Sequence, residues 1–291
     1  MRCRSWRRRR VSVVRALDIA NAEGEEAEGF AENLTLRCFP LDHATVKMRA
    51  RAWTLVSILI GAVAVLAPEP DAEAKGGACP GEMGYVEGNG VRVCVDRWEA
   101  SLIDVASGRV HPPYGPLNGR KVRAQSKPNT VPQAYISKVE AEAACKAAGK
   151  RLCKEAEWMR ACQGKVPTAF PYGDDERSGY CNDHGTAPIG VLFKDTDAAF
   201  HSSEAMNDPR LNQVPGTLAR TGSFKKCRNA FGLYDMVGNL HEWIDDPRGT
   251  FRGGYYLDTH KNGLGCKYRT TAHHPRYHDY STGFRCCKDP R

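Results

Sequence analysis

Three patterns that would assign this chain to a common class are missing from its sequence. None of its twelve cysteines stands in a C-x-x-C pair, which removes the usual signature of a zinc-binding knuckle. Its apolar run, residues 54–67, is shorter than the roughly 20 residues that a membrane-spanning helix needs. The formal net charge is +8, but no nucleic-acid-binding motif accompanies it. The sequence therefore predicts a folded protein that does not bind nucleic acid.

The first 74 residues are typical of a leader segment. Residues 1–47 are Arg-rich and then acidic, and we interpret them as a mis-called or disordered extension, with a genuine cytoplasmic extension as the alternative. Residues 48–74 combine basic residues, the apolar run and a small-x-small "AEA" sequence ending at Ala74, the three parts of a secretory signal peptide. A retained N-terminal anchor is the alternative. We therefore predict an exported domain, residues 75–291, periplasmic or extracellular, with no stable membrane span after cleavage.

Ten cysteines lie beyond residue 74, and the even number predicts a disulfide framework in an oxidising compartment. Cys79 and Cys94 flank a turn at Asn89-Gly90 and can close a hairpin there. Cys286 and Cys287 are adjacent, so in an extended strand they point to opposite faces and need different partners.

Two helices are predicted in the first half of the domain. The first has Ser137 as its N-cap, Glu140 three residues later and Gly149 at its end, which is a capping box followed by a glycine stop. The second ends at Gly164. Residues 167–229 show little periodicity and many turn residues, so we expect disulfides or bound ions to hold them.

Three ordered motifs resemble one known family. "AGKRLCKEAEWMRACQG", "FGLYDMVGNLHEWIDD" and "RGGYY...YR...GFRCC" are similar to motifs of the formylglycine-generating enzymes, or sulfatase-modifying factors, over roughly residues 79–288. The resemblance implies an α+β domain with a C-type-lectin-like fold, low in regular secondary structure, disulfide-linked and carrying structural calcium. It also implies a disulfide between Cys145 and Cys286. In active members two thiolates bind copper(I), and O2 is used to oxidise a sulfatase cysteine.

The catalytic pair of that family is altered here. Asp258 stands where one of the copper-binding cysteines is expected, and Cys266 is the candidate for the second thiolate. Copper(I) is soft and prefers sulfur, so a carboxylate at one position weakens its binding. Cys266 and Asp258 are the catalytic candidates if the copper reaction persists. The alternative is that Cys266 is a disulfide partner of Cys162 or of another half-cystine.

The turn "DMVGNLHEW" is the candidate calcium site. It offers only oxygen donors, the ligands that calcium needs. The alternative is a glycine turn with Glu242 in a salt bridge. A second site is expected near Asn182, with Asp183, Asn207 and Asp208. The metal ligands predicted for the first site are the carbonyls of Val237, Gly238 and Leu240 and the side chains of Asn239 and Glu242.

The segment 255–280 is rich in histidine and tyrosine and allows two interpretations. His260, His273, His274 and His278, with Asp258 and Asp279, could form a nitrogen and oxygen site for iron, zinc or copper(II). The other interpretation is a polar, aromatic loop that lines a shallow ligand pocket. The residues predicted to bind a ligand there are Tyr255, His273, Tyr277 and Tyr280.

Three functions remain open from the sequence. The first is an oxidoreductase that modifies a protein or peptide substrate in the cell envelope and descends from the copper chemistry. The second is a non-catalytic module that binds a peptide, a glycan or another envelope partner. The third is a nonheme metal enzyme that uses the histidines.

Overall fold

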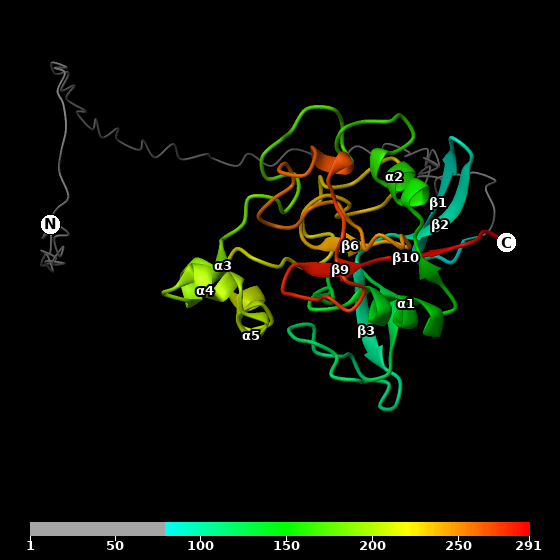
Figure 1. Cartoon of the computed structure of the whole chain (residues 1–291). Coiled ribbons are helices and arrows are strands. Elements are labelled where there is room, and N and C mark those ends of the chain that lie inside the picture. Colours follow the sequence, from blue (N-terminus) through cyan, green and yellow to red (C-terminus); the bar gives the residue numbers. More distant parts are fainter. Residues whose placement is uncertain (1–78) are drawn as a thin grey trace, which may run out of the picture. The chain divides into compact units, whose positions relative to one another are not determined.

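A computed structural model describes residues 79–291 of the chain (Figure 1). The predicted extension, residues 1–47, and the predicted signal peptide, residues 48–74, lie outside these described residues. Within the described part, no helix has the length and apolar character needed to cross a membrane.

The domain begins with the predicted hairpin. Strands β1 (Met83–Gly88) and β2 (Val91–Asp96) pair antiparallel around Asn89 and Gly90, whose φ angles are 53° and 76°. Two central residues with positive φ suit the type I′ turn, which Asn-Gly favours because its twist matches that of the strands. The disulfide between Cys79 and Cys94 ties the first residue that the structure describes to β2.

The remaining strands complete three small sheets. One sheet has the order β1-β2-β10-β5, a second consists of β3 and β4, and the third has the order β8-β7-β6-β9. In the third sheet β6 is antiparallel to β7 but parallel to β9. The strands not yet named are β3 (Ala100–Asp104), β4 (Val122–Ser126), β5 (Arg151–Leu152), β6 (His241–Trp243), β7 (Phe251–Arg252), β8 (Arg269–Thr270), β9 (Thr282–Phe284) and β10 (Cys286–Lys288).

Helices α1 (Lys138–Ala147) and α2 (Glu155–Gln163) are the longest helices described. The predicted capping box is confirmed, since the Ser137 side chain accepts from the N–H of Glu140 and the Glu140 carboxylate accepts from the N–H of Ser137. Gly164 follows α2 with a φ of 77°, as expected for a glycine stop.

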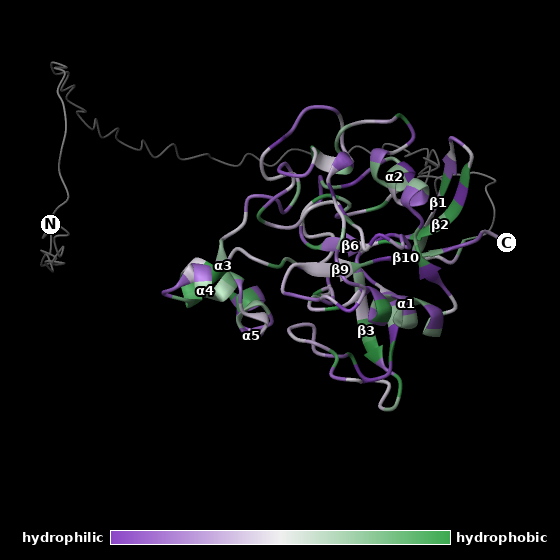
Figure 2. Cartoon of the chain, viewed as in Figure 1, coloured by the Kyte–Doolittle hydropathy of each residue, from purple (hydrophilic) through white to green (hydrophobic). Residues whose placement is uncertain are grey.

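The region between α2 and β6 is mostly loop, as predicted from its lack of periodicity. Figure 1 shows the short helices of residues 188–206 grouped together, and Figure 2 shows mixed polar and apolar residues along them. The short helices described here and later in the chain are α3 (Pro188–Leu192), α4 (Thr196–Phe200), α5 (Ser203–Met206), η1 (Leu211–Gln213) and η2 (Gly265–Lys267). The predicted α+β class, low in regular structure, is confirmed.

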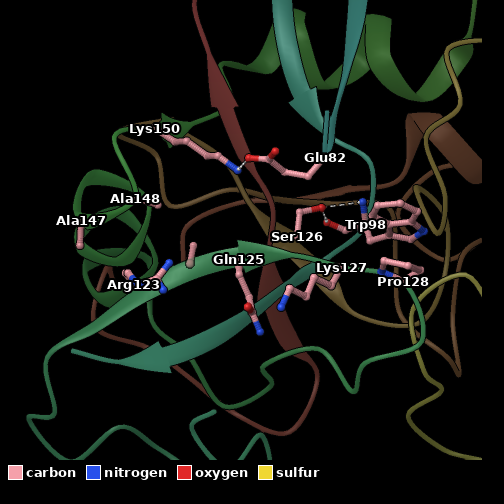
Figure 3. Close-up of a pocket in the computed structure, with 11 residues that line it drawn as sticks. Glu82, Trp98, Arg123, Gln125, Ser126, Lys127, Pro128, Ala147, Ala148 and Lys150 are labelled. Carbon is pink, nitrogen blue, oxygen red and sulfur yellow. Dashed lines mark hydrogen bonds and ion pairs between the residues drawn. The ribbon is translucent and has the colours of Figure 1, made fainter. Parts of the chain in front are cut away.

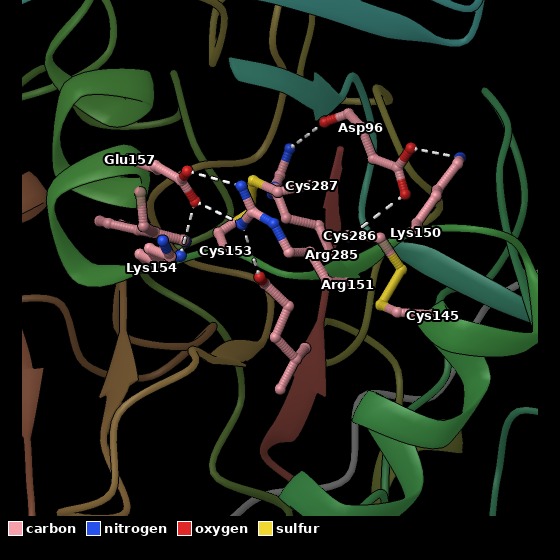
Figure 4. The surroundings of a disulfide bond; sticks show 12 residues. Asp96, Cys145, Lys150, Arg151, Cys153, Lys154, Glu157, Arg285, Cys286 and Cys287 are labelled. Carbon is pink, nitrogen blue, oxygen red and sulfur yellow. Dashed lines mark hydrogen bonds and ion pairs between the residues drawn. A yellow bond between two sulfur atoms is a disulfide. The ribbon is translucent and has the colours of Figure 1, made fainter. Parts of the chain in front are cut away.

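All ten cysteines of residues 79–291 form disulfides. Strand β10 receives two of them on opposite faces, as expected for adjacent half-cystines, and Figure 4 shows the surroundings of the bond from Cys286 to α1. The five pairs are Cys79–Cys94, Cys145–Cys286, Cys153–Cys287, Cys162–Cys266 and Cys181–Cys227.

A buried ion pair lies between the first and third sheets. Arg285 stands between β9 and β10, and its side chain is fully buried. Its Nη2 lies 2.6 Å from Oε1 of Glu242 on β6, and its Nη1 donates to the carbonyl of Asp96 at 3.1 Å. Two more buried carboxylates, Glu99 and Asp235, lie close enough to interact electrostatically with the same guanidinium. Burial raises the pKa of Asp235 to about 7.

The disulfides should differ in their contribution to stability. Cys145 and Cys286 are 141 residues apart, whereas Cys79 and Cys94 are 15 apart. In the chain-entropy model, closing the longer loop contributes about 5 kcal/mol and closing the shorter one about 3 kcal/mol. We expect Cys145→Ala/Cys286→Ala to lower the free energy of unfolding by more than Cys79→Ala/Cys94→Ala does, as measured by urea unfolding. Equal losses would contradict this ranking.

The buried Asp235 should make stability depend on pH. Because its pKa is raised in the folded state, Asp235 stabilises the fold most below its unfolded pKa, and this contribution is lost as the pH rises from about 4 to about 7. We expect the stability of the wild type relative to Asp235→Asn to fall over that range, in urea unfolding at a series of pH values. The exposed Asp197→Asn serves as the control. A difference from Asp235→Asn that is independent of pH would contradict the expectation.

Candidate functional site

The most developed aromatic surface lies on the sheet β8-β7-β6-β9. His241 on β6 is at its centre, with its ring centroid 5.3 Å from that of Phe251 on β7. Tyr255 lies 4.7 Å away on another side of the imidazole, and Tyr268 lies 5.4 Å away. Strands β6 and β7 bring His241 and Phe251 to one face of the sheet, whereas Tyr255 and Tyr268 lie outside the strands.

The stack continues from the sheet to the surface. His273 lies 4.1 Å from Phe251 and 5.3 Å from Tyr277, measured between ring centroids. Tyr277 is 38 % exposed, and its hydroxyl donates to Asp279 at 2.6 Å. Tyr255 and His273 are half-buried. We call this set the aromatic cluster, which consists of His241, Phe251, Tyr255, Tyr268, His273 and Tyr277.

The predicted binding residues are partly brought together. Tyr255, His273 and Tyr277 belong to the aromatic cluster, and Tyr280 lies 6.0 Å from Tyr255 between ring centroids. Tyr280 is only 2 % exposed, however, so it supports the surface and does not present its ring to a ligand. His241 was missed by the sequence interpretation. The only sequence feature that could have indicated it is its position two residues before Trp243 in the "HEW" strand.

Burial keeps His241 neutral. It lowers the pKa of His241 to about 3, because the charged imidazole would lose its water among aromatic rings. The Nδ1 atom of His241 is buried and has no hydrogen-bond partner. His241 is therefore a neutral imidazole packed among aromatic rings.

The predicted four-histidine metal site is not assembled in the structure. His260 pairs with Glu176, His273 packs on Phe251, and Nδ1 of His278 lies 2.7 Å from Oδ1 of Asn207. These different partners follow from the irregular path of the chain between residues 258 and 278. Proximity in the sequence therefore did not produce convergence in space.

Cys266 has the disulfide partner that the alternative interpretation proposed. It bonds to Cys162 on α2, and both residues are fully buried. A thiolate is the form of cysteine that binds metal and acts as a nucleophile, and a disulfide sulfur is not a thiolate. The assignment of Cys266 as a catalytic thiolate is therefore wrong for this state of the protein.

Asp258 closes a turn. Its Oδ1 accepts from the backbone N–H groups of His260 and Lys261 at 2.9 and 3.0 Å, and its Oδ2 accepts from the Tyr268 hydroxyl at 3.0 Å. Partial burial alone would raise its pKa, but these hydrogen bonds outweigh burial and lower the pKa of Asp258. The carboxylate holds a loop, and the structure gives it no sulfur partner for copper(I).

The donors of the predicted calcium turn are already engaged. The Glu242 carboxylate accepts from Arg285 and, at 2.7 Å, from Nε1 of Trp158. Asn239 accepts from Nδ2 of Asn182 at 2.9 Å through its Oδ1. A guanidinium against the Glu242 carboxylate disfavours a second cation there, and this contact is the salt bridge of the alternative interpretation, while calcium at the turn stays a prediction.

The second predicted calcium group is also dispersed. Asn182 donates to Asn239 and to the carbonyl of Thr217, whereas Asp208 is bound by Arg210 and Asn207 contacts His278. Asp183 instead contacts His184 at 2.8 Å.

A cleft of about 670 Å³ lies elsewhere on the domain, near the end of α1. Glu82 and Lys150 line it and form a salt bridge of 3.1 Å. Trp98 and Arg123 also line it (Figure 3). None of the predicted site residues lines this cleft.

Comparison with known proteins identifies the family. Residues 82–290 match the sulfatase-modifying factor enzyme 1-like domain. The chain belongs to this family. The predicted resemblance is therefore confirmed, and with the α+β arrangement it supports the C-type-lectin-like fold class.

Two curated relatives of this sulfatase-modifying factor family illustrate its range. The chain is 30 % identical over 191 residues to the "Formylglycine-generating enzyme" of Mycobacterium tuberculosis, covering 55 % of this chain and 58 % of the relative. It is 27 % identical over 186 residues to the "Inactive C-alpha-formylglycine-generating enzyme 2" of Bos taurus, covering 60 % and 54 %. The chain thus spans a little over half the length of these relatives.

Solved structures with a similar chain path include the variable protein 1 of Treponema denticola. It aligns with a TM-score of 0.45 and 15 % identity, covering 74 % of this chain and 93 % of the other. CarF aligns with a TM-score of 0.43 and 14 % identity, covering 72 % and 97 %.

The neutrality of His241 gives a prediction for this sulfatase-modifying factor domain. Because burial lowers the pKa of His241 to about 3, its imidazole C–H signals should stay constant between pH 8 and pH 5 in a proton NMR titration. His184, whose pKa is raised by its hydrogen bond to Asp183, should become protonated in the same experiment. Protonation of His241 above pH 5 would show that the cluster is open to water.

Proposed function

We propose that this protein is an exported sulfatase-modifying factor domain that does not oxidise cysteine and binds a peptide segment of an envelope protein at the aromatic cluster. The Cys162–Cys266 disulfide carries this proposal. It uses the one cysteine that remained for the second copper ligand, and Asp258 stands at the other position.

The chemistry of copper supports the non-catalytic part. Two thiolates hold copper(I) in a low-coordinate, redox-active state, and a carboxylate with a disulfide sulfur offers neither the softness nor the charge of that pair. A relative from Bos taurus is named "Inactive C-alpha-formylglycine-generating enzyme 2". By its name, this relative is a member of the family without the activity.

The aromatic cluster supports the binding part. Tyrosine is enriched at protein interfaces because its ring adds apolar area and its hydroxyl a hydrogen bond, at a low cost in side-chain entropy. Tyr277 is partly exposed, and its hydroxyl, which donates to Asp279, can still accept from a backbone N–H, while half-buried His273 and Tyr255 continue the cluster inward. A peptide suits this face because it supplies apolar side chains for the rings and a backbone for the hydroxyl.

The disulfides support export. Five of them cross-link residues 79–291, and disulfides persist mainly in oxidising compartments such as the periplasm or the cell exterior. The predicted signal peptide, residues 48–74, gives the same destination.

The proposal predicts the state of Cys266. Protein purified from an oxidising compartment should yield the Cys162–Cys266 linked peptide in mass-spectrometric mapping without reductant, and should take up no stoichiometric copper(I). It should also leave a cysteine-containing sulfatase-derived peptide unoxidised after incubation with copper and O2. A free Cys266 thiol together with conversion of that peptide to formylglycine would overturn the proposal.

The binding surface can be tested with a displayed random-peptide library. Peptides enriched on the wild type should lose at least about fivefold in affinity for Tyr277→Ala, since truncating an aromatic anchor typically costs more than about 1 kcal/mol. Tyr85→Ala, on the distant β1, is the matched control and should bind normally. Enriched peptides that bind Tyr277→Ala as tightly as the wild type would contradict a peptide-binding face. So would a protein that binds only glycans.

A further inference from the structure

A group of metal-ligating side chains lies outside the aromatic cluster. Glu176, Asp183 and His184 each place a ligand atom within 4.8 Å of the others, and theirs is the one such group of three found among residues 79–291. His260 joins them from a different loop, with its Nε2 2.9 Å from Oε2 of Glu176. Two loops far apart in the sequence thus meet at one carboxylate.

The local chain holds Asp183 firmly in place. The Cys181–Cys227 disulfide precedes it, and the N–H of Asn239 donates to the carbonyl of Asn182 at 2.8 Å. Gly238 allows this close approach, because a Cβ at that position would lie 2.2 Å from the same carbonyl oxygen. Asp183 is therefore positioned by covalent and backbone contacts before any ligand binds.

The Asp183 carboxylate is buried and only partly hydrogen-bonded. The residue is only 4 % exposed, and its Oδ1 lies 2.8 Å from Nδ1 of His184. Its Oδ2 is buried and has no hydrogen-bond partner. Leaving a buried carboxylate oxygen without a donor or a cation costs free energy, so the site favours a positive ligand.

The protein supplies no permanent cation to this group. All ion pairs of Glu176 and Asp183 within the described residues are with His184 and His260, which are charged only when protonated. No Lys or Arg of that part of the chain forms a salt bridge with either carboxylate. Two carboxylates and two imidazoles therefore converge without a fixed positive charge.

His260 is oriented by hydrogen bonds at its backbone N–H and at its Nδ1 atom. The backbone N–H of His260 donates to Asp258, and its Nδ1 lies 3.2 Å from Oγ1 of Thr259, which leaves Nε2 directed at Glu176. Hydrogen bonding at one ring nitrogen fixes the tautomer that offers the other nitrogen to a metal. The turn closed by Asp258 thus places a candidate ligand.

We propose that Glu176, Asp183, His184 and His260 bind one divalent transition-metal ion, with Zn²⁺ as the fitting test ion. Imidazole nitrogen and carboxylate oxygen together match zinc, which takes four such ligands in tetrahedral sites. Glu176, His184 and His260 have side chains that are 35 %, 56 % and 42 % exposed, so they can close on an ion by small rotations. The ion would join the 171–184 loop to the 258–267 loop.

The test uses the full chain, free of affinity tags and treated with EDTA, then titrated with Zn²⁺ by calorimetry. We expect one ion per domain, and at least about a tenfold loss of affinity for His184→Ala, for His260→Ala and for Asp183→Asn. His201→Ala is the matched control, because His201 is exposed and its hydrogen bond and ion pair are both with Asp197. Visible absorption of the Co²⁺-loaded protein should show nitrogen and oxygen ligation that disappears in His184→Ala/His260→Ala.

Folding of each variant is checked by its circular dichroism and by its thermal midpoint without metal. Zn²⁺ should raise that midpoint in the wild type and in His201→Ala but not in the double variant. Zinc uptake that is the same in the wild type and in the folded double variant would overturn the proposal, as would no uptake at all. Neither result bears on peptide binding, which has its own variants and readout.

Discussion

The pair formed by Arg285 and Glu242 is the interaction on which the arrangement of this domain depends. Arg285 connects the end of β9 to the start of β10, so its side chain lies where the third sheet meets the first. It satisfies Glu242 on β6, and its remaining N–H groups bind the carbonyls of Asp96 and Tyr234. Removing one partner of a buried pair leaves an uncompensated charge and typically costs about 3–5 kcal/mol. Removing Arg285 would leave Glu242 without its cation, buried beside Glu99 and Asp235.

The same pair fixes the surface that we propose for binding. Side chains alternate along a strand, so on β6 Glu242 faces the ion pair while His241 and Trp243 face the other side. His241 then meets Phe251, Tyr255 and Tyr268, and Trp243 meets Phe251. The orientation of the aromatic cluster is therefore tied to a charged contact on the opposite face of the strand, together with the two disulfides that directly follow Arg285.

Asp258, His260 and Cys266 lie close together in one segment of the chain but have different roles in the structure. Asp258 closes the turn that orients His260, whereas Cys266, eight positions after Asp258, is bonded to α2. A segment that in active relatives is implied to carry redox thiols is here anchored at one end by a disulfide. At its other end, Nε2 of His260 lies 2.9 Å from Oε2 of Glu176.

The sequence by itself determined the features that depend on residues close together in the chain. The Asn89-Gly90 hairpin, the Ser137 capping box and the opposite faces of Cys286 and Cys287 follow from local backbone geometry, and the motifs gave the family. Tertiary structure decided the rest, because partners far apart in sequence compete for each side chain. Glu242 pairs with Arg285, Cys266 with Cys162 at a separation of 104 residues, and His260 with Glu176. A local sequence pattern does not specify which distant residue a side chain contacts, because these contacts are decided when the whole core packs.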